Sequence, residues 1–236
     1  MSNFLELCQR TAREAGIAGI GPSTTLGQTG ELANVVRWVQ SAYREIQNRH
    51  GGHWRFLRHG FTLDTVADTD TYAFTAATDS TTASAITRFS SWRFQDRIKP
   101  PTIFLTSAGS GTQTWMIFAK WEPFGQIYQF SNQIPAYPAH ITIKFTDEIV
   151  LGPIPNDIYT VTGEYWRSAQ ELAADDEVPE MPIQFHDLIV WYAIEHYGYN
   201  EAAAESLAHA EVMQRKYMRQ LEANQIERFG RARPLA

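Results

Sequence analysis

The sequence has little of three features that would each point to a class of protein: cysteine, long apolar runs and positive charge. Cys8 is the only cysteine in 236 residues, so no disulfide framework can form. The longest apolar run, residues 188–194, is much shorter than the roughly 20 residues that span a bilayer. A net charge of −6 argues against a general nucleic-acid binder, because phosphate contacts need concentrated Lys and Arg. Since a signal-peptide layout is also missing, we expect a soluble globular protein that stays in the cytoplasm.

Motifs for catalysis and for cofactor binding are missing as well. The glycine-rich residues 109–112 lack the lysine of a P-loop, and no serine has the G-x-S-x-G setting. His186 and His196 point in different directions on one predicted helix, without H-E-x-x-H spacing. The acidic run at residues 171–180 resembles paired catalytic carboxylates, but it lies in a proline-punctuated linker where solvation explains it. The sequence therefore predicts no enzyme, no cofactor and no metal site.

Helical periodicity occupies the N-terminal part of the chain. Asn3 and Glu6 have the spacing of a capping box, and the apolar residues that follow fall on one helical face. Residues 16–30 contain five glycines and one proline, which predicts a loop. Thr29 is a candidate cap for a second helix that continues to about Arg49.

The longest helical pattern, residues 181–228, predicts an almost continuous helix with a kink or short break at residues 198–200. Apolar residues surround its first half, which is typical of a helix buried on most sides. In the second half they narrow to a stripe that needs a partner. We interpret this stripe as a subunit or bundle seam, formed by Ala203, Leu207, Ala210, Gln214, Tyr217 and Leu221. Residues 228–236 are basic and are expected to form a non-helical arm.

Between these helical regions the apolar period changes from near 3.6 to 2, which indicates strands. Aromatic and β-branched residues predict strands at residues 89–94, 102–105, 114–118, 126–130, 140–145 and 158–162. Because no helix is predicted between them, we expect an antiparallel β sandwich or barrel-like domain. The sequence has 13% aromatic residues. The default expectation is that Trp92, Trp115, Trp121 and Trp166 lie in the core of this domain. The alternative is that some of the aromatic residues are exposed and anchor an interface.

The order of these elements predicts an α+β fold. Residues 1–58 and 168–236 would form a discontinuous helical bundle domain, made from both chain ends because lone amphipathic helices must bury their apolar faces. The arm at 228–236 would belong to this domain. Residues 59–167 would form an inserted β domain.

Several local patterns, in order along nearly the whole chain, together resemble a known family. They are residues 21–24 (Gly-Pro-Ser-Thr), 27–31 (Gly-Gln-Thr-Gly-Glu), 38–47, 54–57 (Trp-Arg-Phe-Leu), 163–168 and 181–191. Their order and spacing resemble the head-to-tail adaptor, or connector, proteins of tailed bacteriophages. The middle of the β region, residues 75–138, carries little of this resemblance.

The resemblance implies a structural protein of the virion neck that is assembled in the host cytoplasm. Such a subunit forms a ring, expected to be a dodecamer, below the portal protein and presents a platform for tail or nozzle proteins. Genomic DNA would pass through the channel as non-specific content during ejection, and the net negative charge suits that passage. In such adaptors the C-terminal helix and tail reach the portal. The residues predicted to bind the portal are Arg228, Phe229, Arg231, Arg233, Pro234 and Leu235.

Two other classes remain open on the sequence. One is a virion-associated glycan hydrolase, which would require two acids that converge in a cleft. The other is a binding or chaperone-like protein that never enters a virion, and its absence from purified particles would identify it.

Overall fold

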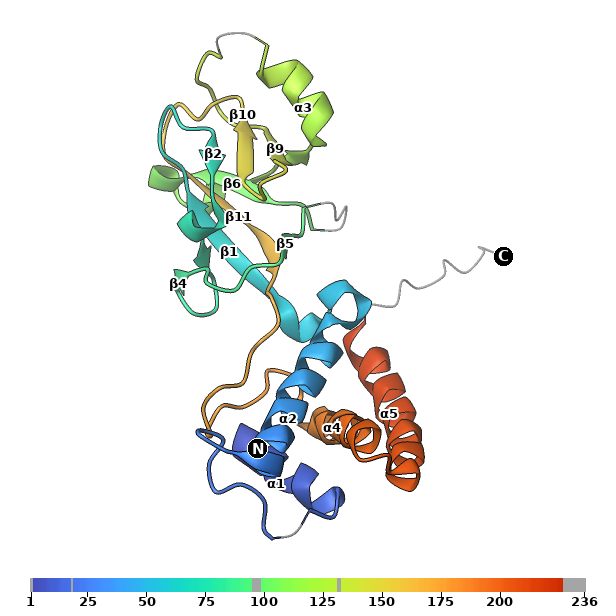
Figure 1. Cartoon of the computed structure of the whole chain (residues 1–236). Helices are drawn as coiled ribbons and strands as arrows, with labels where there is room; N and C mark the ends of the chain where they lie inside the picture. The colour runs from blue at the N-terminus through green and yellow to red at the C-terminus, as the bar shows by residue number, and fades with distance from the viewer. Residues whose placement is uncertain (1, 18, 95–98, 131–132, 227–236) are drawn as a thin grey trace, which may run out of the picture. The chain divides into compact units, whose positions relative to one another are not determined.

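A computed structural model describes residues 2–17, 19–94, 99–130 and 133–226 of the chain (Figure 1). The chain divides into two compact units, one formed by Met1–Leu57 with Ala169–Ala236 and the other by Arg58–Ser168. We call them the helical unit and the β unit. The fold is α+β, as predicted. Within the described ranges, no helix is both long and apolar enough to cross a membrane.

The helical unit combines four α-helices from the two ends of the chain. Helix α4 contacts α1, α2 and α5 and is therefore the central helix of the unit (Figure 1). The elements are α1 (Phe4–Glu14), α2 (Gly30–Asn48), α4 (His186–Asn200) and α5 (Ala204–Gln225), with the 3-10 turns η1 (Arg49–Gly52), η2 (Arg55–Leu57) and η6 (Ile183–Phe185).

The predicted capping box starts helix α1. Asn3 accepts a hydrogen bond from the Glu6 backbone N–H at 2.8 Å, and the Glu6 carboxylate accepts one from the Asn3 backbone N–H at 3.3 Å. Phe4, on the buried face of α1, is fully buried. In the loop after the helix, Gly21 has a φ of +85° and approaches α1 so closely that a Cβ would lie 2.9 Å from the Gln9 Cα. Only glycine fits there.

Residues 169–181, which we call the strap, bind α1, α2 and the glycine-rich loop. Gln47 and Gln170 form a reciprocal pair: the Gln47 side-chain amide donates to the Gln170 carbonyl at 3.0 Å, and the Gln170 backbone N–H donates to Gln47 Oε1 at 2.7 Å. Two acids of the run that is predicted to be solvated also accept backbone hydrogen bonds. Asp175 accepts from the Thr25 backbone N–H at 2.6 Å, and Glu177 accepts from the Ala173 backbone N–H at 2.5 Å. The Asp175 carboxylate therefore holds the glycine-rich loop against the strap, and the Glu177 carboxylate stabilises a turn within the strap.

The prediction of an almost continuous C-terminal helix is also wrong. The chain reverses direction after Asn200, where Ala202 has a φ of +51°, and α5 packs back along α4. Gly198 permits the reversal, because a Cβ at this position would lie 3.2 Å from the Leu207 Cβ. The predicted break at residues 198–200 was therefore close to the real one. The two helices form an αα-hairpin, and the narrow stripe of α5 finds its first partner within the same chain.

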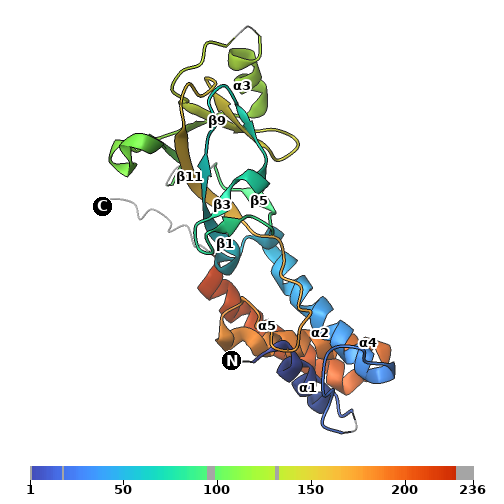
Figure 2. The same cartoon turned by 90° about the vertical axis from the view of Figure 1, so that its left-hand side faces the viewer.

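The β unit contains two open sheets, and the described residues form no closed barrel (Figure 2). The seven-stranded sheet has the order β4-β3-β1-β11-β6-β7, with β5 paired to β11, and the four-stranded sheet has the order β2-β10-β9-β8. The strands are β1 (Arg58–Asp64), β2 (Thr71–Tyr72), β3 (Thr78–Asp79), β4 (Ser84–Ala85), β5 (Ser91–Trp92), β6 (Thr102–Leu105), β7 (Thr114–Trp115), β8 (Ile117–Phe118), β9 (His140–Ile143), β10 (Ile149–Gly152) and β11 (Tyr159–Trp166). The short turns are η3 (Phe74–Ala76), η4 (Thr106–Ala108) and η5 (Ser110–Thr112).

Strands β1 and β11 form the longest ladder of the β unit, and aromatic side chains fill the core beside it. Phe61 lies opposite Gly163 in the register, and a Cβ on Gly163 would come within 2.8 Å of the Phe61 ring. The glycine thus leaves the space that the ring occupies. Phe61 and Trp92 then meet edge to face, with ring centroids 4.7 Å apart, and Phe94 joins the same cluster.

One predicted strand is a helix. Residues 126–130 were expected to be extended, but Trp121–Tyr128 forms helix α3. Pro123 fits the first turn of this helix, and Phe124 and Tyr128 meet one turn apart, with ring centroids at 4.9 Å. This helix connects β8 to β9, and these two strands are parallel. The expectation of purely antiparallel pairing is therefore wrong for this pair, since a crossover helix allows parallel neighbours.

Candidate functional site

The seam residues of α5 lie against α4 within the hairpin. Gln214 is nearly buried, and its side-chain amide donates to the Trp191 carbonyl at 3.1 Å and to Glu195 Oε2 at 2.6 Å. Leu221 is fully buried, whereas Leu207 and Tyr217 are half-buried. These four residues therefore share the inner side of α5. Their use as a contact to a neighbouring subunit stays a prediction.

Two buried residues of this helix were missed by the sequence pattern. Met218 and Gln225 are 5% and 7% exposed and lie on the same side of α5 as Gln214 and Leu221. The helical spacing could have identified both residues, because residues four positions apart lie on the same face of a helix. Met218 follows Gln214 by four positions, and Gln225 follows Leu221 by four. The predicted seam includes Tyr217, which is only half-buried, and omits Met218, which is buried.

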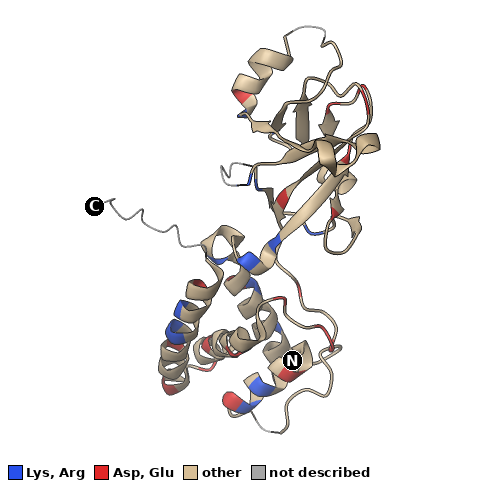
Figure 3. Ribbon diagram, turned by 180° about the vertical axis from the view of Figure 1, so that it is seen from behind, with Lys and Arg blue, Asp and Glu red and all other residues tan. Residues whose placement is uncertain are grey.

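The outer side of α5 carries charge of both signs (Figure 3). Arg215 Nη2 lies 2.9 Å from Glu211 Oε2, one turn away, and the two side chains are 68% and 42% exposed. Near the end of the helix, a shallow cavity of about 180 Å³ is lined by three arginines, Arg49, Arg215 and Arg219, together with Glu222 and three residues of α4 and α5. Arginines outnumber acids here, so this surface suits an acidic partner group.

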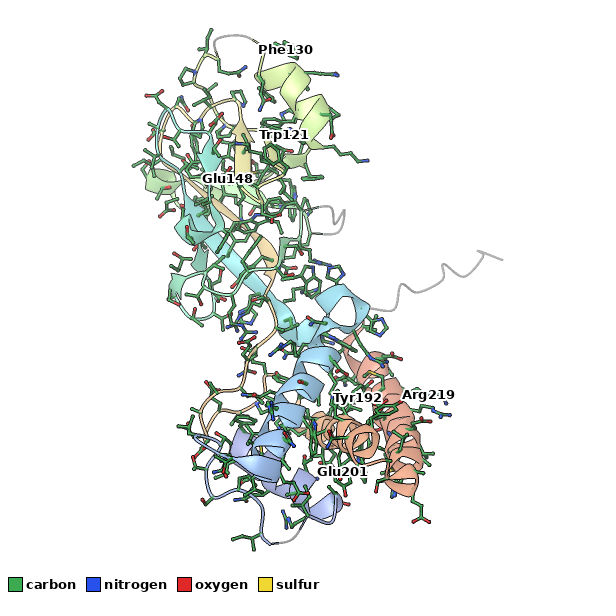
Figure 4. All side chains as sticks on the ribbon, in the orientation of Figure 1. Trp121, Phe130, Glu148, Tyr192, Glu201 and Arg219 are labelled. Atoms are coloured by element: carbon green, nitrogen blue, oxygen red, sulfur yellow. The ribbon has the colours of Figure 1, made fainter. Side chains whose placement is uncertain are left out.

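The floor of the same cavity is Tyr192, which projects from α4 toward the end of α2. Figure 4 labels Tyr192 and Arg219 in this part of the helical unit. The Arg49 guanidinium lies over the Tyr192 ring, 5.3 Å from its centroid. Burial raises the pKa of Tyr192 to about 12, so the phenol stays neutral at physiological pH. On the rim, His50 Nε2 is 2.9 Å from Glu222 Oε1, which leaves that carboxylate partly engaged.

The residues predicted to bind the portal lie outside the described residues. They are Arg228, Phe229, Arg231, Arg233, Pro234 and Leu235. Helix α5 ends at Gln225, and the last described residue, Ile226, lines a second shallow cavity with Arg219, Glu222 and Ala223. Both cavities therefore include residues near the described end of α5, and only the first is basic.

The tryptophans of the β unit divide between core and surface. Trp92 is 7% exposed and belongs to the core, as expected. The core expectation is wrong for Trp115, which is 63% exposed, while Trp121 and Trp166 are half-buried. Further apolar side chains are also exposed in this unit, including Phe130, Ile134 and Phe145. Exposed aromatic and aliphatic side chains of this kind are enriched at the centres of interfaces.

The histidines and acids considered for chemistry serve structural contacts in the part of the chain described. His186 is buried, and its Nε2 lies 2.8 Å from the Met181 carbonyl; burial lowers the pKa of this histidine. His196 Nε2 lies 3.1 Å from Glu45 Oε1. No group of three or more His, Cys, Asp or Glu side chains in the described ranges is placed to hold a metal ion.

Comparison with models of known protein families gives a match over nearly the whole chain. The family model described as SU10 adaptor protein matches residues 2–235. No curated protein is similar enough to the chain to count as a match.

Proposed function

Because this chain belongs to the SU10 adaptor protein family, we propose that it is the head-to-tail adaptor that forms a ring below the portal of its phage. The match over residues 2–235 carries this proposal. It confirms the resemblance to bacteriophage adaptors and supports a structural role in the virion, together with other head and tail proteins. The ring, expected to be a dodecamer, would hold a central channel for genomic DNA.

We assign the two units to different neighbours. The helical unit would build the ring and contact the portal, and its basic cavity near the end of α5 supports that role because a protein partner can supply carboxylates to three arginines. The β unit would meet tail or nozzle proteins through its exposed apolar side chains, such as Phe130 and Ile134.

The arm at residues 228–236 would anchor the portal. Arg228, Arg231 and Arg233 offer forked donors for carboxylates, while Phe229 and Leu235 can fill apolar pockets. Ordering such a tail costs about 1–2 kcal/mol per residue in backbone entropy, so several good contacts are needed. We therefore expect the chain to stay a monomer until the portal provides a template for the ring.

The test is a truncation after Glu227, mixed with the portal of the same phage. Because the buried residues of α5 end at Gln225, the truncated chain should melt within about 1 °C of the full chain, whereas portal binding should weaken by about 100-fold or more. Sedimentation measures both the monomeric state of the free chain and the complex.

Two full-length variants separate the parts of the arm. Replacing Arg228, Arg231 and Arg233 by Gln should remove most of the salt dependence of portal binding, while replacing Phe229 and Leu235 by Ala should weaken binding equally at low and high salt. A truncated chain that binds the portal with unchanged affinity would show that the arm is not the anchor. A full chain that forms no complex with the portal would overturn the adaptor assignment.

A further inference from the structure

A cavity of about 510 Å³ lies over the seven-stranded sheet of the β unit, on the side that faces away from the hydrophobic core. Along β11 the core side carries Val161 and Tyr165, so the alternating residues Thr162 and Glu164 face outward. The volume is in the range of small-molecule sites. Nothing in the adaptor role requires this cavity.

The floor of the cavity is a row of threonine hydroxyls. Thr62, Thr162 and Thr102 are direct cross-strand partners in β1, β11 and β6. Neighbouring strands lie about 4.8 Å apart, so the row repeats at that interval. Thr102 and Thr162 share a hydrogen bond of 2.6 Å, whereas the Thr62 hydroxyl has no hydrogen-bond partner among the residues that the structure describes. The floor therefore offers at least one hydroxyl to a ligand.

One wall of the cavity is an exposed indole. Trp115 pairs with Thr102 in the register of β6 and β7, so it continues the row of outward-facing residues. Its exposed fraction of 63% is unusual for tryptophan, and the ring borders the cavity. Beside it, the Gln113 side-chain amide donates to Thr102 Oγ1 at 2.5 Å and keeps its carbonyl oxygen for another partner.

Lys99 is the one charged residue among the described residues that line the cavity, and it is paired with Glu164, which lies outside the lining. Lys99 Nζ lies 2.6 Å from Glu164 Oε1, and Arg93 Nη1 lies 2.7 Å from Glu164 Oε2. The groups that remain for a ligand are hydroxyls, an amide and an indole face. Such a set fits a neutral molecule with one apolar face and several hydroxyl groups at its edge.

We propose that this cavity binds a pyranose saccharide. The apolar C–H face of the sugar ring would stack on Trp115, and sugar hydroxyls would bond with Thr62 and Gln113 on the floor and wall. An apolar ligand would cover the Thr62 hydroxyl without giving it a hydrogen bond, which costs free energy because that hydroxyl is removed from water. One stacked ring with a few exposed hydrogen bonds predicts a Kd on the order of 1 mM.

The experiment titrates the isotopically labelled full chain with the methyl glycosides of glucose, galactose, mannose and N-acetylglucosamine, up to about 50 mM, and follows amide and indole NMR signals. At least one glycoside should give saturable shifts at Thr62, Thr102, Gln113 and Trp115. The binding of this glycoside is then measured in three variants.

Trp115→Ala and Thr62→Val should each weaken binding by about tenfold or more, and both positions can be changed without emptying the core. Phe145→Ala is the matched control, because Phe145 is an aromatic residue of the same unit that is 82% exposed and does not border the cavity. The Phe145→Ala variant should bind the glycoside with the same affinity as the unchanged chain. Absence of saturable shifts with all four glycosides would overturn the proposal. Unchanged binding by Trp115→Ala, or shifts confined to other residues, would also overturn it, and none of these outcomes bears on portal binding.

Discussion

The two units close their cores in different ways. The helical unit assembles α1 and α2 from one end of the chain with α4 and α5 from the other, and the reciprocal Gln47–Gln170 pair joins the two parts. The β unit is built from one continuous segment, with β1 and β11 at its two ends paired to each other. In both units, segments that are distant in the sequence pack together. Only in the β unit do all of these segments belong to one uninterrupted stretch of chain.

The surfaces of the units differ as well. Of the fourteen large apolar side chains that are exposed in the described residues, nine lie in the β unit, among them Trp115, Phe130 and Phe145. The helical unit has only five of the fourteen, and its surface carries the cavity lined by Arg49, Arg215 and Arg219. This contrast supports partners of different chemistry: acidic and salt-sensitive for the helical unit, and apolar for the β unit.

The largest expected effect tests whether the two cores are independent. Trp54 is fully buried in the helical unit, and its Nε1 donates to the Ile46 carbonyl at 2.9 Å; Phe61 is 1% exposed in the β unit. Trp54→Ala and Phe61→Ala should each cost about 3–5 kcal/mol, because each leaves a large cavity. Hydrogen exchange should show protection lost in the mutated unit alone.

Each of these two variants serves as the control for the other. Amides of α2 and α4 report on the helical unit, while those of β1 and β11 report on the β unit. Equal loss of protection in both units for either variant would mean that the chain unfolds as a single cooperative body. The two cores would then not be independent.

Helix periodicity predicted most of the helical unit because each helix buries one face and the capping signals are local. The Asn3–Glu6 capping box needs only four consecutive residues. The reversal after Asn200 was harder to predict, because it depends on the close approach of Gly198 to Leu207, which is a contact between two helices. Sequence spacing can locate a weak point in a helix, but it does not give the direction of the chain beyond it.

The β unit was harder to predict because most of its strands are short and their pattern is ambiguous. Residues 126–130 alternate like a strand, yet they belong in part to helix α3, where Phe124 and Tyr128 pack one turn apart. The threonine row under the cavity was not predictable, since it depends on the register of β1, β11 and β6. The exposure of Trp115 likewise follows from its strand and face, which composition does not reveal.

A smaller effect is expected from Asp79 in the β unit. Burial alone would raise the pKa of this carboxyl, but hydrogen bonds from Tyr165, Thr81 and Thr82, with the nearby His59, lower it to about 2 from an ordinary value of 3.8. The folded-state pKa is below the unfolded one, so the ionised group stabilises the fold above about pH 4, and this stabilisation is lost as the pH falls toward 2.

Asp79→Asn should therefore destabilise the β unit by about 1–3 kcal/mol at pH 7, because it removes a charged acceptor from the Tyr165 hydroxyl. The difference from the unchanged chain should shrink as the pH falls from 4 to 2. Urea unfolding at several pH values measures it. Glu122→Gln, on the exposed side of α3, is the matched control and should be neutral. A constant difference across this pH range would show that the Asp79 charge does not carry the effect.

The smallest effect on stability is expected on the outer side of α5. The charged residues on this side are expected to bind the portal and to contribute little to the stability of the fold. The Arg215 side chain is 68% exposed, and its pair with Glu211 spans one helical turn, so Arg215→Ala should cost less than about 0.5 kcal/mol. The double variant Arg215→Ala with Arg219→Ala should nevertheless weaken portal binding by about tenfold at low salt, and by little at high salt, because both residues line the basic cavity.

Arg44→Ala is the matched control: this arginine is also exposed and paired with an acid, Glu171 at 3.6 Å, but does not line that cavity. If Arg44→Ala weakens the complex as much as the double variant, total charge decides the affinity. If Arg215→Ala alone lowers stability by more than about 1 kcal/mol, this side of α5 is part of the fold, and the distinction between a charged binding surface and a buried seam fails.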